Sequence, residues 1–454
     1  MAIACLCLLT LPAVATRPHT ADEIEYFSFL RSLWFDRDLS FDNEYRYFVE
    51  HRFTTDPGFP ATFLDQSTPT GVRPTFATIG AAILWAPFYA IADAGVRVAR
   101  ALGSDVAADG FSRPYLTAVA WGSAVYGWLA LVLSASVARQ LGGLGAAAAV
   151  AVALGTPLLF YMYAQPGFAH ACSACVVALF VWTWMRVRGS WSVPGVAALA
   201  AIAALMTMVR EQDAFIVIAP AVDYLAHAPG GDGVAAWVRR AAARFAAAAA
   251  AFAVCFAPQA LAYIVINGHL GPSPIVANKM VWSAPWAMAV VFSPSHGWLA
   301  WTPLVAVALT GLIAAAVAPP GGDRRLRAVA VLLVLAVTSQ VYVSGSVATW
   351  TLAGAFGQRR FVGLTVCLVI GIAWLLARAT SRSRRVLAAA VVVLAALWNV
   401  GLAFQFAERS MDRQRLELAR NARTTFLELP MRVPSLVYRY LFDRGSFYAA
   451  PVER

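Results

Sequence analysis

Two adjacent carboxylates head a helical pattern shortly after the first apolar run of the chain. Asp22 and Glu23 follow Thr20, and a hydroxyl residue with a carboxylate three positions later is the pattern of a capping box. Apolar residues from Tyr26 to Trp34 then recur every three or four positions, which predicts a helix lying on a membrane surface. The two carboxylates therefore either cap this helix or act at the membrane boundary as a general base or a metal ligand.

More acidic residues follow in the same segment. Asp36 and Asp38 form a D-x-D pattern, with Asp42 and Glu44 close behind. This pattern favours a solvated turn after the helix, and oxygen-rich clusters of this kind also suit Mg²⁺ or Mn²⁺.

Arginine supplies the complementary chemistry in two places. Arg359 and Arg360 follow Gly357-Gln358, and Arg210 opens the stretch Arg-Glu-Gln-Asp between two apolar runs. A guanidinium fork matches phosphate oxygens in paired hydrogen bonds, so these three arginines are candidate phosphate ligands. The alternatives are lipid headgroup anchoring for the first pair and a local ion pair with the neighbouring acids for Arg210.

A few other polar residues are candidates for supporting roles. They are Gln165, His170, His296 and Gln358. A lone histidine is more often a hydrogen-bonded structural group than a catalyst. Cys172 and Cys175 lie in an apolar run with no second cysteine pair nearby, which favours a helix wall over a redox or metal site.

These residues belong to a membrane protein. The chain has 454 residues, of which 60% are hydrophobic and 13% charged. An ordinary soluble domain has about half apolar and a quarter charged residues, so the composition predicts a polytopic, all-α membrane protein. The net charge of +11 is carried mostly by arginine in loops, where it orients membrane proteins, and it does not indicate nucleic-acid binding.

Apolar runs divide the chain into about eleven spans of the hydrocarbon. With the N-terminal run 1–16, they are 115–138, 144–163, 168–186, 194–210, 213–227, 245–266, 298–318, 328–347, 360–377 and 386–406. Basic residues gather in alternate loops, which we expect to be cytoplasmic: near Arg139, at 186–188, at 239–244, at 324–327 and at 378–385. The segment 17–114 is then outside only if the apolar run 75–96 does not cross, so we interpret that run as an interfacial or re-entrant helix.

Four regions follow from this topology. Residues 1–16 form a short first span, with a cleaved secretory signal as the alternative, and 17–114 form a long outer loop with juxtamembrane helices. Residues 115–406 form a bundle of about ten membrane helices, and 407–454 form an outer amphipathic tail.

The outer loop resembles that of the GT-C superfamily of membrane glycosyltransferases, which includes protein O-mannosyltransferases and lipid A aminoarabinose transferases. The resemblance is carried by Asp22, Glu23, Tyr26, Arg31-Ser32-Leu33, Asp36 and Asp38-Leu39, and by the Pro/Gly-rich stretch and apolar helix between Thr68 and Tyr89. It implies a GT-C-like bundle that uses a polyprenyl-phosphate sugar donor and a glycan, lipid or protein acceptor. It further implies a site on the outer, periplasmic face of a bacterial plasma membrane.

The resemblance assigns roles to particular residues. Asp22, with Glu23 as its neighbour, is implied to deprotonate an acceptor hydroxyl or to hold a metal. Arg359, Arg360 and Arg210 are implied to hold the donor phosphate, so that one direct displacement inverts the anomeric carbon.

In one respect the chain departs from the pattern. The turn 163–170 lacks the second acid that the family often has there, with His170 as the available substitute, so a divalent cation (Mg²⁺ or Mn²⁺) stays open as cofactor. A lipid transporter or flippase is the alternative function, and a non-catalytic lipid-binding relative is a third. A transporter predicts polar residues in the middle of several spans, whereas here they gather at the span ends.

Overall fold

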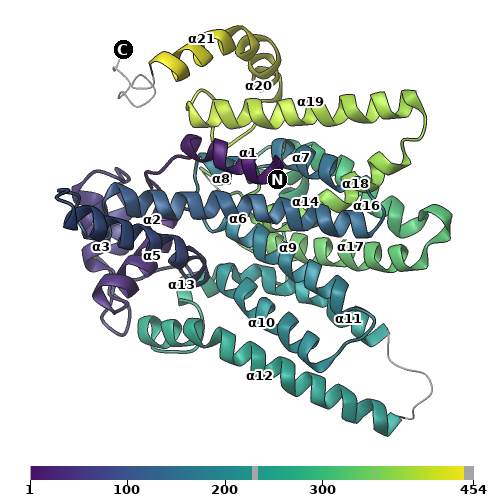
Figure 1. Cartoon of the computed structure of the whole chain (residues 1–454), viewed down its shortest axis with the longest axis horizontal. Helices are drawn as coiled ribbons and strands as arrows, with labels where there is room; N and C mark the ends of the chain where they lie inside the picture. The colour runs from purple at the N-terminus through teal and green to yellow at the C-terminus, as the bar shows by residue number, and fades with distance from the viewer. Residues whose placement is uncertain (1, 227–233, 353, 444–454) are drawn as a thin grey trace.

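The computed structural model describes residues 2–226, 234–352 and 354–443. In these ranges all regular structure is helical, and the only strand-like pairing is the isolated bridge between Met280 and Val347. Figure 1 shows long helices running side by side, with shorter helices of the first loop gathered at one end. Residues 444–454 of the predicted tail and the loop 227–233 lie outside the described residues.

The predicted apolar runs fall on helices. They are α1 (Ala2–Thr10) with η1 (Leu11–Ala13), α6 (Arg113–Gln140), α7 (Gly145–Gly155), α8 (Leu158–Tyr163), α9 (His170–Val187), α10 (Val193–Val209), η3 (Glu211–Val217), α11 (Ile218–Ala226), α12 (Val234–Asn267), α15 (Trp298–Trp301), α16 (Leu304–Val317), α17 (Arg324–Gly345), η5 (Arg359–Leu364), α18 (Thr365–Arg378) and α19 (Arg382–Ala407). Within the described residues, 7 helices are long and apolar enough to cross a membrane. The protein is therefore a helical membrane protein, and the count of about eleven spans stays a prediction.

Proline divides two of the predicted spans. The run 144–163 breaks at Pro157 between α7 and α8, and the run 298–318 breaks at Pro303 between α15 and α16. A break inside an apolar bundle leaves carbonyl groups without helical partners. At the first break, the side chain of Asn399 from α19 donates to the carbonyls of Leu154 and Thr156, both at 2.9 Å.

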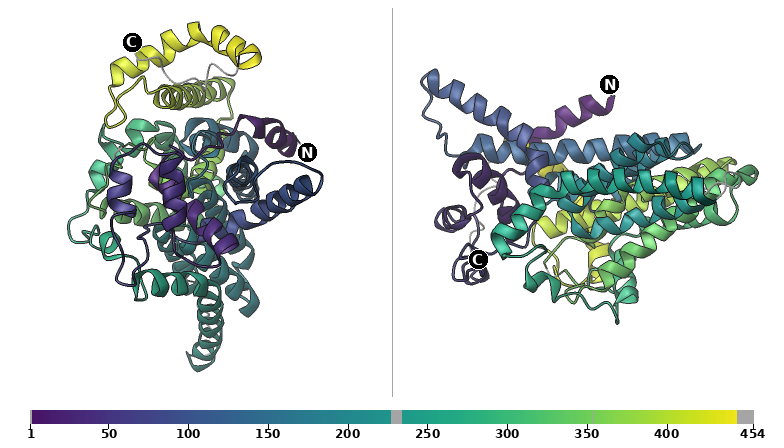
Figure 2. Two further views of the ribbon diagram at one scale, coloured as in Figure 1. Left: turned by 90° about the vertical axis from the view of Figure 1, so that its left-hand side faces the viewer. Right: turned by 90° about the horizontal axis from the view of Figure 1, so that it is seen from below.

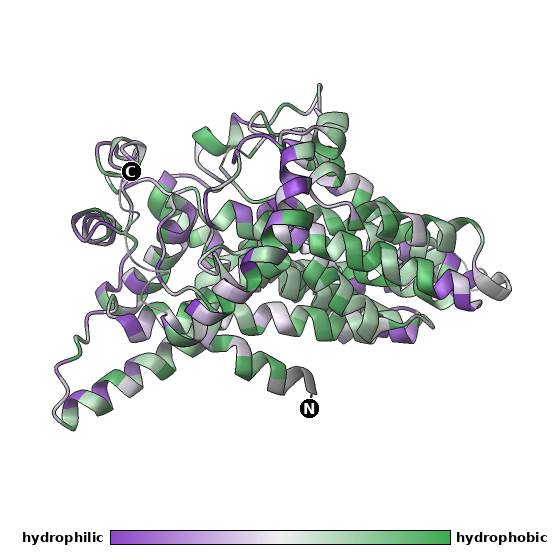
Figure 3. Ribbon diagram, turned by 90° about the horizontal axis from the view of Figure 1, so that it is seen from above, coloured by the Kyte–Doolittle hydropathy of each residue, from purple (hydrophilic) through white to green (hydrophobic). Residues whose placement is uncertain are grey.

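The first loop forms a group of helices of its own. They are α2 (Ala21–Arg31), the π-helical turn η2 (Ser32–Asp36), α3 (Asp42–Glu50), α4 (Gly58–Phe63) and α5 (Gly80–Ala101). A buried aromatic cluster joins them, in which Phe27 of α2 packs edge-on against Phe48 of α3 and Tyr89 of α5. Figure 3 shows hydrophilic residues concentrated in this end of the molecule, while the long helices are mainly hydrophobic.

The predicted basic loops lie at the opposite end of the bundle (Figure 1). Arg188, Arg324 and Arg325 line one hollow there, although Arg188 follows α9 and the other two begin α17, far apart in the sequence. This separation of acidic and basic ends agrees with the topology from the arginine count, but the orientation in a membrane stays a prediction.

Helix α5 covers most of the run that we interpreted as interfacial. It has 22 residues and is long and apolar enough to cross a membrane. It runs obliquely to the long helices and away from them (Figure 2, right), and Ile91, Val98 and Leu102 are exposed along it. An interfacial position therefore stays a prediction that the oblique course favours.

The C-terminal segment packs on the bundle through polar contacts. It comprises α20 (Leu418–Arg423), the π-helical turn η6 (Thr424–Glu428) and α21 (Leu429–Phe442). Gln405 of α19 donates to the carbonyl of Asn421 at 3.3 Å and to the hydroxyl of Thr425 at 2.9 Å. Exposed Met431, Tyr438 and Phe442 leave an apolar surface on α21, as expected of an amphipathic helix at a membrane.

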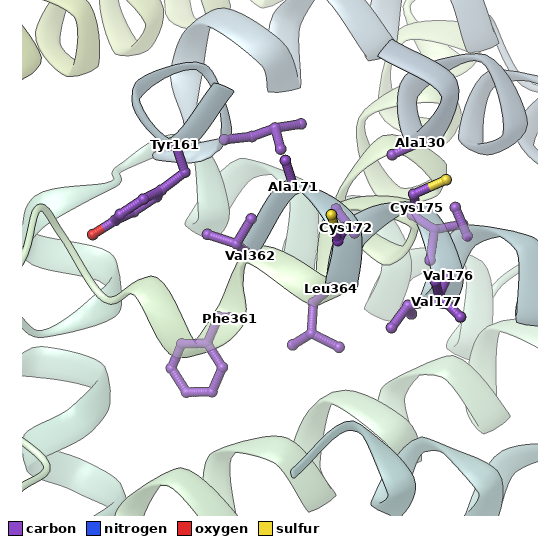
Figure 4. Packing of buried hydrophobic residues seen from close by; sticks show 14 of the residues in the cluster. Ala130, Tyr161, Ala171, Cys172, Cys175, Val176, Val177, Phe361, Val362 and Leu364 are labelled. Atoms are coloured by element: carbon purple, nitrogen blue, oxygen red, sulfur yellow. The ribbon is translucent and has the colours of Figure 1, made fainter. Parts of the chain in front are cut away.

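Two contacts in the bundle fix the position of η5. Helices α16 and α18 cross so closely that a Cβ added at Gly371 would lie 2.0 Å from the carbonyl oxygen of Ala308, and one at Gly311 would lie 2.0 Å from that of Gly371. Val362 and Leu364 of η5 lie beside Ala171 and Cys172 of α9 (Figure 4). Cys172 and Cys175 are free and buried in this helix, as predicted for a helix wall.

We expect Gly371→Ala to destabilise the fold by about 1–3 kcal/mol, because the added methyl group meets backbone rather than a movable side chain. Thermal unfolding of the detergent-solubilised protein measures the loss. Gly95→Ala is the matched control, since nothing lies within 4 Å of a Cβ added at that position in α5. Equal unfolding temperatures for the two variants would contradict the close α16–α18 crossing.

Candidate functional site

A cavity of about 590 Å³ opens where the first loop meets the ends of the bundle helices. Asp22, Glu25 and Tyr26 of α2 line it together with Arg210, Gln212, Arg359 and Arg360. Further lining residues come from the segment 76–78 and from the loops at 272–282 and 343–352. The predicted residues Asp22, Arg210, Arg359 and Arg360 thus meet in one cavity.

Asp22 and Arg359 are joined directly. Arg359 Nη1 lies 2.7 Å from Asp22 Oδ2, although the residues are far apart in the sequence. Asp22 lies in the first turn of α2, where the helix dipole favours a negative charge. The ion pair therefore joins the first loop to the η5 segment at the cavity surface.

Glu23 has a different place. Its Oε2 accepts hydrogen bonds from the backbone of His19 at 3.1 Å, from the backbone of Thr20 at 3.2 Å and from the Thr20 hydroxyl at 3.0 Å. These contacts complete the predicted capping box. Glu23 is buried and does not line the cavity. Its contacts therefore support the capping role. The catalytic role remains a prediction without structural support.

The other early acids form ion pairs away from the cavity. Arg31 pairs with Asp36 and, at 2.9 Å, with Glu44, while Asp42 pairs with Arg46 and Arg73. Asp38 accepts from Ser32 at 2.7 Å across the turn. The D-x-D pattern thus stabilises the end of α2, in line with the turn interpretation.

The turn 163–170 supports both arginine sites. The guanidinium of Arg359 lies over the ring of Phe168 at 4.9 Å, and Phe168 stacks on His170. Arg210 Nη1 donates to His170 Nδ1 at 2.6 Å. Gln165 contacts His19 at 3.3 Å and so links this turn to the start of α2. His170 and Gln165 therefore position other residues and do not line the cavity.

Gln212 connects the two arginine segments. Its side-chain oxygen accepts from Arg210 Nη2 at 3.1 Å, and its side-chain nitrogen donates to the carbonyl of Arg360 at 2.6 Å. Gln340 of α17 holds the backbone of Gln212 through a hydrogen bond of 2.8 Å. The relative position of Arg210 and Arg360 is therefore fixed by one neutral side chain.

His296 and Gln358 brace the turn that leads into Arg359. Gln358 donates to the carbonyl of His296 at 3.1 Å, and His296 Nε2 lies 2.9 Å from the carbonyl of Ala355. Burial lowers the pKa of His296 to about 4, so the ring is neutral and its Nε2–H donates to that carbonyl. Both residues support the site from behind the cavity wall.

Sequence reasoning missed three charged residues of the cavity, Glu25, Glu211 and Lys279. Glu25 lies three positions after Asp22, on the same face of α2, and this spacing could have identified it. Lys279 comes from the loop before α14 (Ala287–Phe292). The backbone N–H of Ala348 donates to the carbonyl of Lys279, and that of Val281 donates to the carbonyl of Ser346. These hydrogen bonds hold the loop against the segment after α17. No periodicity marks this pairing in the sequence.

The cavity is electropositive. Arg210, Arg359, Arg360 and Lys279 line it, and in the described residues only Arg359 among them forms an ion pair with a carboxylate. Burial, and secondarily the charge of Asp22, raises the pKa of Glu25 to about 8, so this carboxyl is mostly protonated at neutral pH. Burial also raises the pKa of Glu211. The cavity therefore favours an anionic ligand.

The same charges disfavour a cation. Among the described residues, no three acidic, histidine or cysteine side chains are grouped as metal ligands. A divalent ion bound to Asp22 would have to displace Arg359 and lie among the remaining cations. The residues present do not fit the Mg²⁺ or Mn²⁺ site that the resemblance left open.

A comparison with protein-family models finds no match, and a comparison with curated proteins finds no significantly similar sequence.

We expect Arg359→Gln to weaken the binding of farnesyl phosphate about tenfold or more, because a hydrogen-bonded charge contributes about 1.5–3 kcal/mol. Asp22→Asn should strengthen the binding, because it removes the anion that competes for the guanidinium. Isothermal titration in nanodiscs measures both effects. Arg46→Gln is the control, since Arg46 forms its ion pair with Asp42 at the surface of α3. Equal affinities for all these proteins would exclude the cavity as the phosphate site.

Proposed function

We propose that this protein is a membrane glycosyltransferase that moves a sugar from a polyprenyl-phosphate donor to an acceptor hydroxyl, with inversion at the anomeric carbon. The observation that carries the proposal is the ion pair of Asp22 and Arg359 in an electropositive cavity at one end of an apolar bundle. A general base and a phosphate ligand in one cavity are what such a transfer requires.

The ion pair is the contact that a donor phosphate has to displace when it binds. A donor phosphate competes with Asp22 for Arg359, and Arg360 and Arg210 line the same cavity. When the phosphate takes the place of Asp22 on the guanidinium, the carboxylate is released. Donor binding thus prepares the base.

The transfer itself is then a single displacement. Asp22 accepts the proton of the acceptor hydroxyl, the acceptor oxygen bonds to the anomeric carbon, and the bond from that carbon to the phosphate oxygen breaks. The electron pair leaves with the phosphate, whose growing negative charge the arginines stabilise. The acceptor attacks on the side opposite the phosphate, so the anomeric configuration inverts.

A hydrophobic route for the lipid supports this assignment. Phe215 and Trp282 line the cavity, their rings lie 5.9 Å apart, and both are partly exposed. Ile218, Val222 and Leu225 continue this exposed apolar surface along α11. A phosphate at the arginines would therefore have an apolar path beside it for a prenyl chain.

The other functions predict different residues in the spans. A transporter or flippase needs polar groups near the middle of the membrane, whereas the charged residues of this cavity lie in the N-terminal part of α2, at the end of α10 and the start of η3, in the loop before α14 and in η5 before α18. A non-catalytic relative would bind the donor and transfer nothing. The periplasmic face and the bacterial plasma membrane remain parts of the proposal.

We expect Asp22→Asn to lower the rate of sugar transfer about 10²–10⁴-fold, the usual contribution of a general base. The measurement uses purified protein in nanodiscs, synthetic polyprenyl-phosphate sugars and a panel of hydroxyl acceptors, with the anomeric configuration of the product read by NMR.

The same preparation separates the alternatives. Donor binding retained by Asp22→Asn shows that the variant is folded. Undiminished transfer by Asp22→Asn removes this residue from the mechanism. If the wild-type protein transfers no sugar but moves labelled lipid across vesicles, the flippase alternative replaces the proposal.

A further inference from the structure

Glu25 is a second carboxyl group on the cavity wall, one helical turn after Asp22. It lies on the same face of α2 as Asp22 and Tyr26, and all three line the cavity. Arg210 and Arg359 line the same cavity as these three residues of α2.

Glu25 is held in place by a separate segment. Its Oε2 accepts hydrogen bonds from the Thr75 hydroxyl at 2.9 Å and from the backbone N–H of Phe76. Phe76 also lines the cavity, and Lys279 Nζ lies 5.3 Å from the centre of its ring. The carboxyl is therefore oriented by the loop before α5, while Asp22 is oriented by Arg359.

The two carboxyl groups differ in their surroundings. Asp22 forms an ion pair with a guanidinium, whereas burial and the charge of Asp22 raise the pKa of Glu25 to about 8. Two carboxyl groups in different environments of one site are the usual arrangement of a base and an acid. The reaction proposed above uses the base and leaves the acid without a role.

We propose that Glu25 is the general acid of the transfer and donates its proton to the departing phosphate oxygen. This inference rests on the proposed function. Asp22 gains the acceptor proton as the new glycosidic bond forms, and Glu25 loses a proton to the phosphate as the old bond breaks. Proton transfer from Asp22 back to Glu25, one helical turn away, restores the resting state. The acceptor proton thus ends on the polyprenyl phosphate.

Several other charged or titratable groups surround Glu25 and could alter the pH dependence. They are Asp22 and Tyr26 on α2, Tyr45 on α3, Arg210 and Glu211 before α11, Lys279 in the loop before α14, and Arg359 and Arg360 in η5. Burial and the charges of Arg359 and Arg210 lower the pKa of Arg360 to about 9, so a decline that begins above pH 9 belongs to this arginine. Because the pKa of Glu25 is raised, its proton is present below about pH 8 and lost above it. The wild-type rate should therefore fall as the pH rises through 8.

The test compares Glu25→Gln with Glu44→Gln. A glutamine oxygen can still accept from Thr75 and Phe76, so the first variant keeps the anchor and loses the proton. Glu44 is a buried carboxyl of α3 whose pKa is also raised to about 8, but it pairs with Arg31 and does not line the cavity. We expect Glu25→Gln to lower kcat at pH 7 about 10²-fold or more and to remove the decline near pH 8, and Glu44→Gln to retain that decline.

A second sugar donor distinguishes a general acid from a residue that only anchors the loop. In a phosphorothioate donor the leaving group is a weaker base than phosphate and needs less protonation, so Glu25→Gln should lose much less activity with this donor. An equal loss with both donors, together with a retained alkaline decline, would assign Glu25 an anchoring role and overturn the inference.

The wild-type protein tests the inference even if the variant does not fold. With the phosphate donor its rate should fall above pH 8, and with the phosphorothioate donor the fall should be weaker. A rate that is flat to pH 9 with both donors overturns the role of Glu25. Absence of any transfer by the wild type at any pH is a different result, which contradicts the proposed function itself.

Discussion

The structure depends on the pairing of Arg359 with Asp22, because a charge at the end of an apolar bundle needs a partner. Arg359 enters the cavity from the segment before α18, and Asp22 meets it at 2.7 Å from the first turn of α2. A lone buried guanidinium would be costly, and the pair lowers that cost while it joins the first loop to the bundle. In the described residues, Arg210, Arg360 and Lys279 form no ion pair with a carboxylate. This excess of positive charge is why the cavity favours anions.

The remaining contacts of the site hold the cations close to one another. Like charges repel, so their proximity has to be enforced by the fold. Gln212 holds Arg210 and the backbone of Arg360, His170 accepts from Arg210, and Phe168 lies under Arg359. Neutral side chains thus do the positioning and leave the charges for a ligand. The same logic makes Glu25 more useful as a neutral carboxyl than as a second anion beside Asp22.

Much of the site could be predicted from residue types. The capping box at Thr20 predicted the start of α2 and therefore the position of Asp22. The arginines at 210, 359 and 360, which the sequence predicts to be phosphate ligands, line one cavity with Asp22. Glu23 shows the limit of this reasoning. Adjacent carboxylates on a helix point in different directions, and only the fold shows that Glu23 turns back to His19 and Thr20 while Asp22 turns to the cavity.

The sequence by itself determined the class of protein, the helices and the separation of acidic from basic loops, because hydrophobic runs and arginine placement are local properties of a chain in a membrane. Tertiary structure decided which distant segments meet. Three contacts join segments that have no periodic relation to one another. They are the backbone hydrogen bond between Lys279 and Ala348, the hydrogen bond from Gln212 to Arg360, and the hydrogen bonds from Thr75 and Phe76 to Glu25. Protonation of Glu25 was decided in the same way, since it depends on burial and on the distance to Asp22, which the order of residues alone does not fix.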